Sequence, residues 1–217
     1  MRDVPFGKLG AIAGLLFAVL LVVGLLLANG DSPSPDEPDA AHTEWWSDSG
    51  NQANALIGGY LTVLAGLAFL AFMTQVRARL LAREGGAGSL ATAAFGSGVV
   101  FVALLTGGVL AMVTTAGAVK FGDAPVPGAD ILRILPQLGF GMILIGGGLT
   151  AAFSIAAVSW SILRTGVFAR WLAWLGFVCA ILLLFGVFFI PMIALPIWAL
   201  AASVELWRRP EPMPMMA

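Results

Sequence analysis

Long runs of apolar residues constrain this chain more strongly than any other feature of its sequence. They cover residues 9–28, 54–76, 90–119, 138–163 and 171–206. A helix needs about 20 mostly apolar residues to cross the hydrocarbon core of a bilayer, so each of the first four runs is long enough for one crossing. The chain is 59% hydrophobic and 11% charged, whereas about a quarter of the residues of a soluble domain are charged. We therefore predict an all-α integral membrane bundle, built as a single transmembrane domain over residues 1–217.

The last apolar run, residues 171–206, raises the main topological question. As one helix rising about 1.5 Å per residue it would be roughly 54 Å long, far longer than the hydrocarbon core is thick. Pro191 lacks a backbone N–H and disfavours helical geometry at Ile190, and Pro196 falls in the first turns of a following helix. We predict two short helices, 171–189 and 191–206, that turn near Phe188. The expected total is six transmembrane helices; the alternative is five, with one kinked final span.

The first apolar run, residues 9–28, has a second interpretation. The small residues Ala28, Asn29 and Gly30 are compatible with the cleavage site of a signal peptide. The run is long for the apolar region of a signal peptide, so we predict a retained membrane anchor.

The distribution of positive charge predicts the orientation. With six spans, both termini lie on the same side as the loops 77–90 and 164–170. That side collects nine of the eleven basic residues: Arg2, Lys8, Arg77, Arg79, Arg83, Arg164, Arg170, Arg208 and Arg209. The opposite side holds Lys120 and Arg133. Cytoplasmic loops carry an excess of Lys and Arg, so we predict that both termini are cytoplasmic. Arg164 and Arg170, with Trp171 and Trp174, are the expected interface anchors.

Residues 29–53 form an acidic, Pro-rich segment that we place outside the cytoplasm as a loop. It contains Asp31, and its first half, DSPSPDEPD, is too polar to bury apolar surface and is expected to be extended and mobile. Trp45 and Trp46 are expected at the outer headgroup boundary. His42, Glu44 and Asp48 are the one grouping with metal-ligand chemistry, but a single His in such a segment favours a solvated loop over a metal site.

A second outer segment, residues 120–137, contains turn residues followed by DILRIL. Asp130 and Arg133 are three residues apart, so on a short helix they share a face and can pair. We predict an amphipathic turn that lies on the outer interface and leads into the fourth span, with Arg133 as an anchor; capture of a ligand by Arg133 is the alternative.

Small residues are the expected means of helix packing inside the membrane. Gly10 and Gly14 form a small-xxx-small face, and Gly59 and Gly66 are spaced seven residues apart. Gly146 begins a run of three glycines where the helix can bend or loosen. Hydroxyl groups in the spans are expected to bond to helix carbonyls. The alternative is a ligand groove between the third and fourth spans, lined by Thr106, Thr114, Thr150 and Ser154.

Several function classes are disfavoured by what the predicted spans contain. Their cores hold no Asp, Glu, Lys or Arg, which are the usual markers of ion paths and proton relays. Ser97 lies in an FGSG stretch, but no His in any span can activate it. The sequence has one His and one Cys, too few for a haem held by two histidines or a zinc site of the usual type. We predict that the protein is not an enzyme and has no cofactor, and the net charge of −1 argues against nucleic acid as a partner.

Residues 151–176, AAFSIAAVSWSILRTGVFARWLAWLG, carry small and aliphatic residues, then L-R-T-G, then R-W-L-A-W-L-G. This pattern resembles actinobacterial multipass membrane proteins, which are similar to a bacterial family catalogued as a domain of unknown function. The resemblance extends over residues 130–206, where Asp130 and Arg133 match an acidic-then-basic lead-in. It implies six spans and a location in the plasma (inner) membrane of a bacterium. It transfers no catalytic residues because the family has no established activity.

Two functional hypotheses follow. The first is an accessory or scaffold component of the membrane, which binds itself or other membrane-protein subunits through its Gly-rich helix faces. The second is a binder or carrier of a small apolar or lipid-like molecule. In both hypotheses the protein is embedded in the lipid bilayer, which is its first expected partner.

Overall fold

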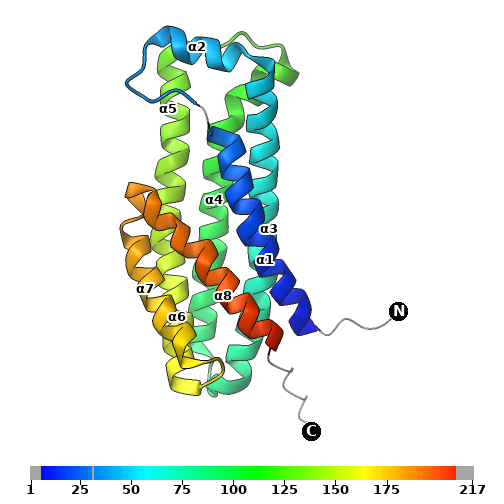
Figure 1. Ribbon diagram of the computed structural model, residues 1–217, viewed down its shortest axis with the longest axis vertical. Coiled ribbons are helices and arrows are strands. Elements are labelled where there is room, and N and C mark those ends of the chain that lie inside the picture. Colours follow the sequence, from blue (N-terminus) through cyan, green and yellow to red (C-terminus); the bar gives the residue numbers. More distant parts are fainter. Residues whose placement is uncertain (1–5, 31, 209–217) are drawn as a thin grey trace, which may run out of the picture.

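The computed structural model describes residues 6–30 and 32–208, and throughout these ranges the chain forms helices and connecting turns without a strand. Arg2, Asp31 and Arg209, which entered the charge argument, lie outside the described residues. Figure 1 shows long helices side by side and one short helix across an end of the bundle. Five segments are long and apolar enough to cross a membrane: Lys8–Asn29, Ser49–Glu84, Ser89–Gly122, Ala129–Thr165 and Ile190–Arg208. The prediction of an all-α bundle with membrane-spanning helices is confirmed.

The centre of the bundle is formed by α1 (Phe6–Asn29), α3 (Ser49–Glu84) and α4 (Ser89–Gly122). One aromatic ring from each helix meets there: the ring centroid of Phe69 lies 4.7 Å from that of Phe17 and 5.1 Å from that of Phe101. All three side chains are fully buried. These contacts fix the three helices against one another at mid-height.

The predicted packing glycines all face helices of the same chain. A Cβ atom on Gly10 or Gly14 of α1 would meet Gln75 or Phe72 of α3. The corresponding neighbours of Gly59, Gly66 and Gly146 are Val113, Val102 and Leu104. The closest backbone approaches lie elsewhere, between Gly24 and Gly58 and between Gly108 and Gly139. Small residues therefore serve contacts within the bundle.

The second half of the acidic segment forms a helix, which we did not predict. Residues 39–47 form α2 (Asp39–Ser47), which lies across the end of the bundle (Figure 1). The side chain of Asp48 caps α3 by accepting a hydrogen bond of 2.9 Å from the backbone N–H of Asn51. The turn before α2 is held by Arg133, whose guanidinium bonds to the carbonyl oxygens of Pro35 at 3.1 Å and Glu37 at 2.7 Å.

The segment around Arg133 also differs from the prediction. It forms the first turns of α5 (Ala129–Phe140), which runs along the bundle and does not lie flat on its surface (Figure 1). Leu132 of this helix is buried, and α5 packs against α2. Arg133 pairs with Asp39 of α2 at 2.7 Å, and the described contacts include no ion pair between Arg133 and Asp130.

The helix that begins with α5 loosens in its middle, as the glycine run predicted. Residues Gly141–Gly147 form a π-helical stretch, η1, before the chain continues as α6 (Gly148–Thr165). Pro136 removes one backbone donor inside α5, and π-helical segments widen a helix by one residue per turn. The result is an irregular wall on the side of the bundle that faces α1.

The final apolar run forms the expected hairpin. It consists of α7 (Arg170–Leu184), two short 3₁₀ turns, η2 (Gly186–Phe188) and η3 (Ile190–Ile193), and α8 (Ala194–Arg208). Phe189 joins the two turns with φ 64°. With 15 residues, α7 rises only about 22 Å, less than the hydrocarbon core is thick. Figure 1 accordingly shows the hairpin turning partway along the bundle, at a distance from the end that carries α2.

Candidate functional site

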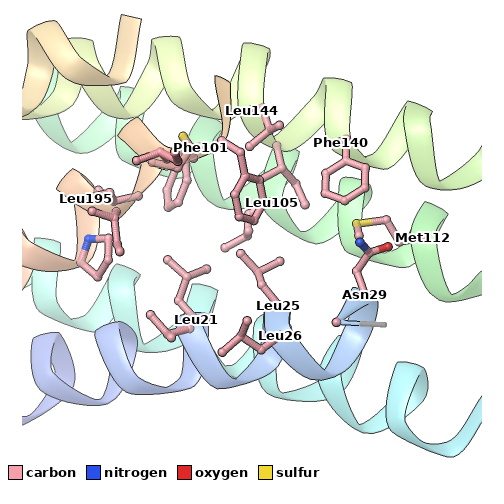
Figure 2. A pocket seen from close by; sticks show the side chains of 18 residues that line it. Leu21, Leu25, Leu26, Asn29, Phe101, Leu105, Met112, Phe140, Leu144 and Leu195 are labelled. Atoms are coloured by element: carbon pink, nitrogen blue, oxygen red, sulfur yellow. The ribbon is translucent and has the colours of Figure 1, made fainter. Parts of the chain in front are cut away.

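A cavity of about 510 Å³ lies where the hairpin stops short of the end of the bundle. We call it the apolar pocket. Its walls come from α1, α4, the α5–η1 segment and the hairpin turn. Figure 2 shows Leu21, Leu25 and Leu26 of α1 on one side, with Phe101 and Leu105 of α4 and Leu144 of η1 opposite. The remaining lining residues are Val22, Asn29, Gly30, Met112, Phe140, Ile143, Phe189, Ile190, Met192, Ile193, Leu195 and Pro196.

The chemistry of this lining is almost uniform. Asn29 supplies the one polar side chain among the described residues that form the walls, and none of those residues is ionisable. Ligand pockets typically measure about 300–1,000 Å³, and cavities lined by apolar side chains do not hold ordered water. The pocket is therefore suited to an apolar molecule or to an apolar part of a larger one.

The position of the pocket along the bundle follows from α1. The 22 residues from Lys8 to Asn29 rise about 33 Å, close to the thickness of the hydrocarbon core. The α1 residues that line the pocket, from Leu21 to Asn29, occupy the part of this helix nearest α2. The pocket consequently lies in the half of the bundle nearer α2.

Part of the lining is also outer surface. Leu26 is 63% exposed, and Ile190 and Ile193 of the hairpin turn are 79% and 61% exposed. Because these side chains border both the cavity and the outside of the bundle, the pocket opens sideways between α1 and the hairpin.

A second, smaller cavity of about 170 Å³ adjoins the first beneath α2. We call it the polar cavity. Asn29 and Phe140 line both cavities. The other residues around the polar cavity include Ser34, His42, Trp46, Leu132, Arg133, Pro136 and Gln137. His42 is 3% exposed, and its Nε2 lies 3.2 Å from the carbonyl oxygen of Ser34, to which it donates.

The four residues predicted to line a groove lie apart from both cavities. The hydroxyl of Ser154 donates to the carbonyl oxygen of Ala94 at 2.7 Å, and that of Thr150 donates to Gly146 at 2.9 Å. Thr114 is exposed and bonds to Leu110 within its own helix at 2.6 Å. Thr106 is half-buried. None of the four borders the apolar pocket or the polar cavity.

The predicted interface anchors gather at the end of the bundle opposite α2. Arg164, Arg170 and Trp174 are exposed there, and the indole Nε1 of Trp171 donates to Oε1 of the buried Glu205 at 3.2 Å. The ammonium of Lys8 lies 5.3 Å from the ring centroid of Trp207, which joins the start of α1 to the end of α8. Both described ends of the chain are therefore at this end of the bundle (Figure 1).

The predicted grouping of His42, Glu44 and Asp48 is divided by the fold. His42 points into the bundle, whereas Glu44 and Asp48 are exposed. Within residues 6–30 and 32–208 there is no cluster of three His, Cys, Asp or Glu side chains with the geometry to hold a metal ion.

Comparison of the chain with family models, with curated proteins and with solved structures finds no match. The resemblance of residues 151–176 to actinobacterial multipass proteins therefore stays a prediction.

Sequence reasoning missed the apolar pocket because its lining has no distinctive chemistry. Leu25, Leu105 and Ile143 have the composition of any apolar span. One signal pointed toward the site: Pro191 predicts the break in the final run, and Phe189 and Ile190 beside it line the cavity. A hairpin that ends before the α2 end of the bundle leaves space between its turn and that end. The π-helical stretch at the glycine run borders this space.

Proposed function

We propose that this chain is a non-enzymatic membrane protein that binds a lipid-like molecule, with the apolar chain of that molecule in the apolar pocket. The observation that carries the proposal is a cavity of about 510 Å³ at lipid depth whose walls contain a single polar side chain. Its sideways opening gives a molecule dissolved in the membrane a path that avoids water.

The scaffold hypothesis receives less support. It required Gly-rich faces for partner helices, but Gly10, Gly14, Gly59, Gly66 and Gly146 all face helices of the same chain. Association with further copies or with other membrane-protein subunits stays a prediction that needs a different surface.

Binding without catalysis is favoured by the lining of the apolar pocket. Covalent catalysis needs a nucleophile beside a base, and general acid–base catalysis needs a titratable group at the reacting atoms. The described walls of the apolar pocket offer neither kind of group. What they offer is apolar contact area and an amide, Asn29, at one end.

The direct test is native mass spectrometry of the wild-type protein transferred from its own membrane into nanodiscs. We expect one defined lipid-like molecule per chain that survives mild washing, because the pocket buries its apolar part. A chain that carries only a random mixture of bulk lipids, or none, would contradict the proposal. A stoichiometric second polypeptide in place of a small molecule would favour the scaffold hypothesis.

We further propose that the end carrying Lys8, Arg164, Arg170 and Arg208 faces the cytoplasm of a bacterial cell. Of the nine described basic residues, seven belong to helix ends or loops at that end, and Lys120 and Arg133 belong to the opposite end. The positive-inside rule supports this orientation. The apolar pocket then lies in the outer half of the plasma membrane.

The orientation predicts the accessibility of single cysteines. In a Cys179→Ala background, a membrane-impermeant maleimide added to intact cells should label Glu44→Cys on α2. It should label Ala87→Cys, in the loop between α3 and α4, only after permeabilisation. Both positions are exposed, so unequal labelling reports the side of the membrane. The reverse pattern would invert the proposed orientation.

A further inference from the structure

We infer that the polar cavity binds the head group of the same molecule and that this head group is anionic, a phosphate or a carboxylate. The inference rests on the proposed function, because it assigns the second half of one amphiphilic ligand. It starts from the wall that the two cavities share.

Asn29 and Phe140 border both cavities. Figure 2 shows them together at one end of the apolar pocket, with Asn29 at the end of α1 and Phe140 opposite. Beyond them lies the polar cavity, under α2 at the end of the bundle. Along the bundle axis, the order is therefore an apolar compartment at lipid depth followed by a polar compartment at the interface. A lipid-like molecule has the same order from its chain to its head.

Arg133 gives the polar cavity its charge preference. It is the one Lys, Arg, Asp or Glu among the described residues that line either cavity. A guanidinium carries five N–H donors in a plane whose fork matches the oxygens of a phosphate or carboxylate. No amphiphile with a cationic head would find an opposing charge on these walls.

The hydrogen bonds of Arg133 leave one edge of the guanidinium for a ligand. Nε donates to Pro35 at 3.1 Å, and Nη2 donates to Glu37 at 2.7 Å and pairs with Asp39 at 2.7 Å. Nη1 has no acceptor among the described residues. Its two N–H groups can therefore bond to an anion without breaking the contacts that hold the turn before α2.

Asp39 is a competing partner, but a weak one. Its side chain is 77% exposed, whereas that of Arg133 is 23% exposed. Exposed ion pairs contribute little to stability because water screens them, so an anionic ligand can share or replace the contact with Asp39 at little cost. If Arg133 binds the ligand, replacing Arg133 should weaken ligand binding, whereas replacing Asp39 should not. If the ion pair is only structural, both substitutions should have the same effect on ligand binding.

The test uses three probes that share one tail: dodecyl phosphate, dodecanol and dodecyltrimethylammonium. Their affinities for the wild type, Arg133→Gln and Asp39→Asn are measured by titration in nanodiscs of zwitterionic lipid with native mass spectrometry. The ratio of variant to wild-type affinity for one probe cancels the partitioning of that probe into the bilayer. Inorganic phosphate, added as a competitor, distinguishes a lipid head group from a free anion.

We expect Arg133→Gln to weaken the binding of dodecyl phosphate about tenfold, which corresponds to about 1.4 kcal/mol. The affinity for dodecanol should stay nearly unchanged. Asp39→Asn should keep or strengthen dodecyl phosphate binding, because it removes the competing carboxylate. Millimolar inorganic phosphate should not displace dodecyl phosphate, since the tail supplies much of the affinity.

Other outcomes would overturn the inference in distinguishable ways. If the wild type binds all three probes equally, or if Arg133→Gln weakens dodecanol as much as dodecyl phosphate, the head-group site is wrong while the apolar pocket stands. If inorganic phosphate displaces dodecyl phosphate, the polar cavity is an independent anion site. If no probe binds the wild type, the proposed function fails as well.

Discussion

Replacing Gly58 with leucine should separate α1 from α3 and abolish the folded bundle. A Cβ atom at this position would overlap the backbone nitrogen of Ala28 and lie 2.5 Å from the carbonyl oxygen of Gly24. The obstructing atoms belong to the backbone, so no rotamer change can accommodate the side chain. Overpacking against yielding side chains costs about 1–3 kcal/mol, and we expect a loss of more than about 3 kcal/mol here because a whole helix must move.

The matched control is Gly96→Leu on α4. This glycine is also helical, but it is exposed and a Cβ atom would find no neighbour within 4 Å. The free energy of unfolding, followed by circular dichroism during titration of mixed micelles with SDS, should change by less than about 1 kcal/mol for this variant. Equal stability of Gly58→Leu and Gly96→Leu would show that α1 and α3 do not approach as closely as described.

The location of this contact shows where sequence reasoning reaches its limit. Gly10 and Gly14 lie on a face of α1 that meets α3 and α8, yet the tightest backbone approach is between Gly24 and Gly58. A glycine pattern shows that a helix can be approached closely. It does not show which helix approaches it or at what height, because those depend on how all the helices pack together.

The hairpin was predictable because its cause is local. Pro191 disfavours helix at the preceding residue and the apolar run is too long for one span, so a break near Phe188 followed from chemistry within a few residues. The depth of the turn was not predictable. It depends on where α8 packs against α1, and this contact joins the two ends of the chain.

The helix α2 was not predicted, for the same reason. The composition of the acidic segment favours a solvated chain, and nothing near it in the sequence indicates a helix at residues 39–47. The residue that holds its turn is Arg133, which bonds to Pro35 and Glu37 from almost a hundred positions away. Burial of His42 and Trp46 then fixes α2 on the end of the bundle. These long-range contacts also create the polar cavity, so the site and the folded segment were missed together.

Replacing Leu25 with tryptophan should prevent the apolar pocket from binding its ligand. Leu25 is half-buried and points into the cavity from α1 (Figure 2). The larger ring would occupy space that is empty in the described structure, so the fold need not be disturbed. We expect at least a tenfold loss of the retained lipid-like molecule, about 1.4 kcal/mol, measured as occupancy by native mass spectrometry in nanodiscs.

Leu16→Trp is the control for this substitution, because it makes the same chemical change on the same helix at a position that does not line the pocket. Leu16 is exposed on the outside of the bundle, so a tryptophan there faces lipid and should leave occupancy unchanged. Both variants should unfold at a similar SDS fraction to the wild type. Loss of ligand in Leu25→Trp alone locates the binding site in the cavity, because only that variant reduces the volume of the cavity. Equal occupancy in both would place any bound lipid on the outer surface, where a long hydrophobic helix holds lipids without selecting among them.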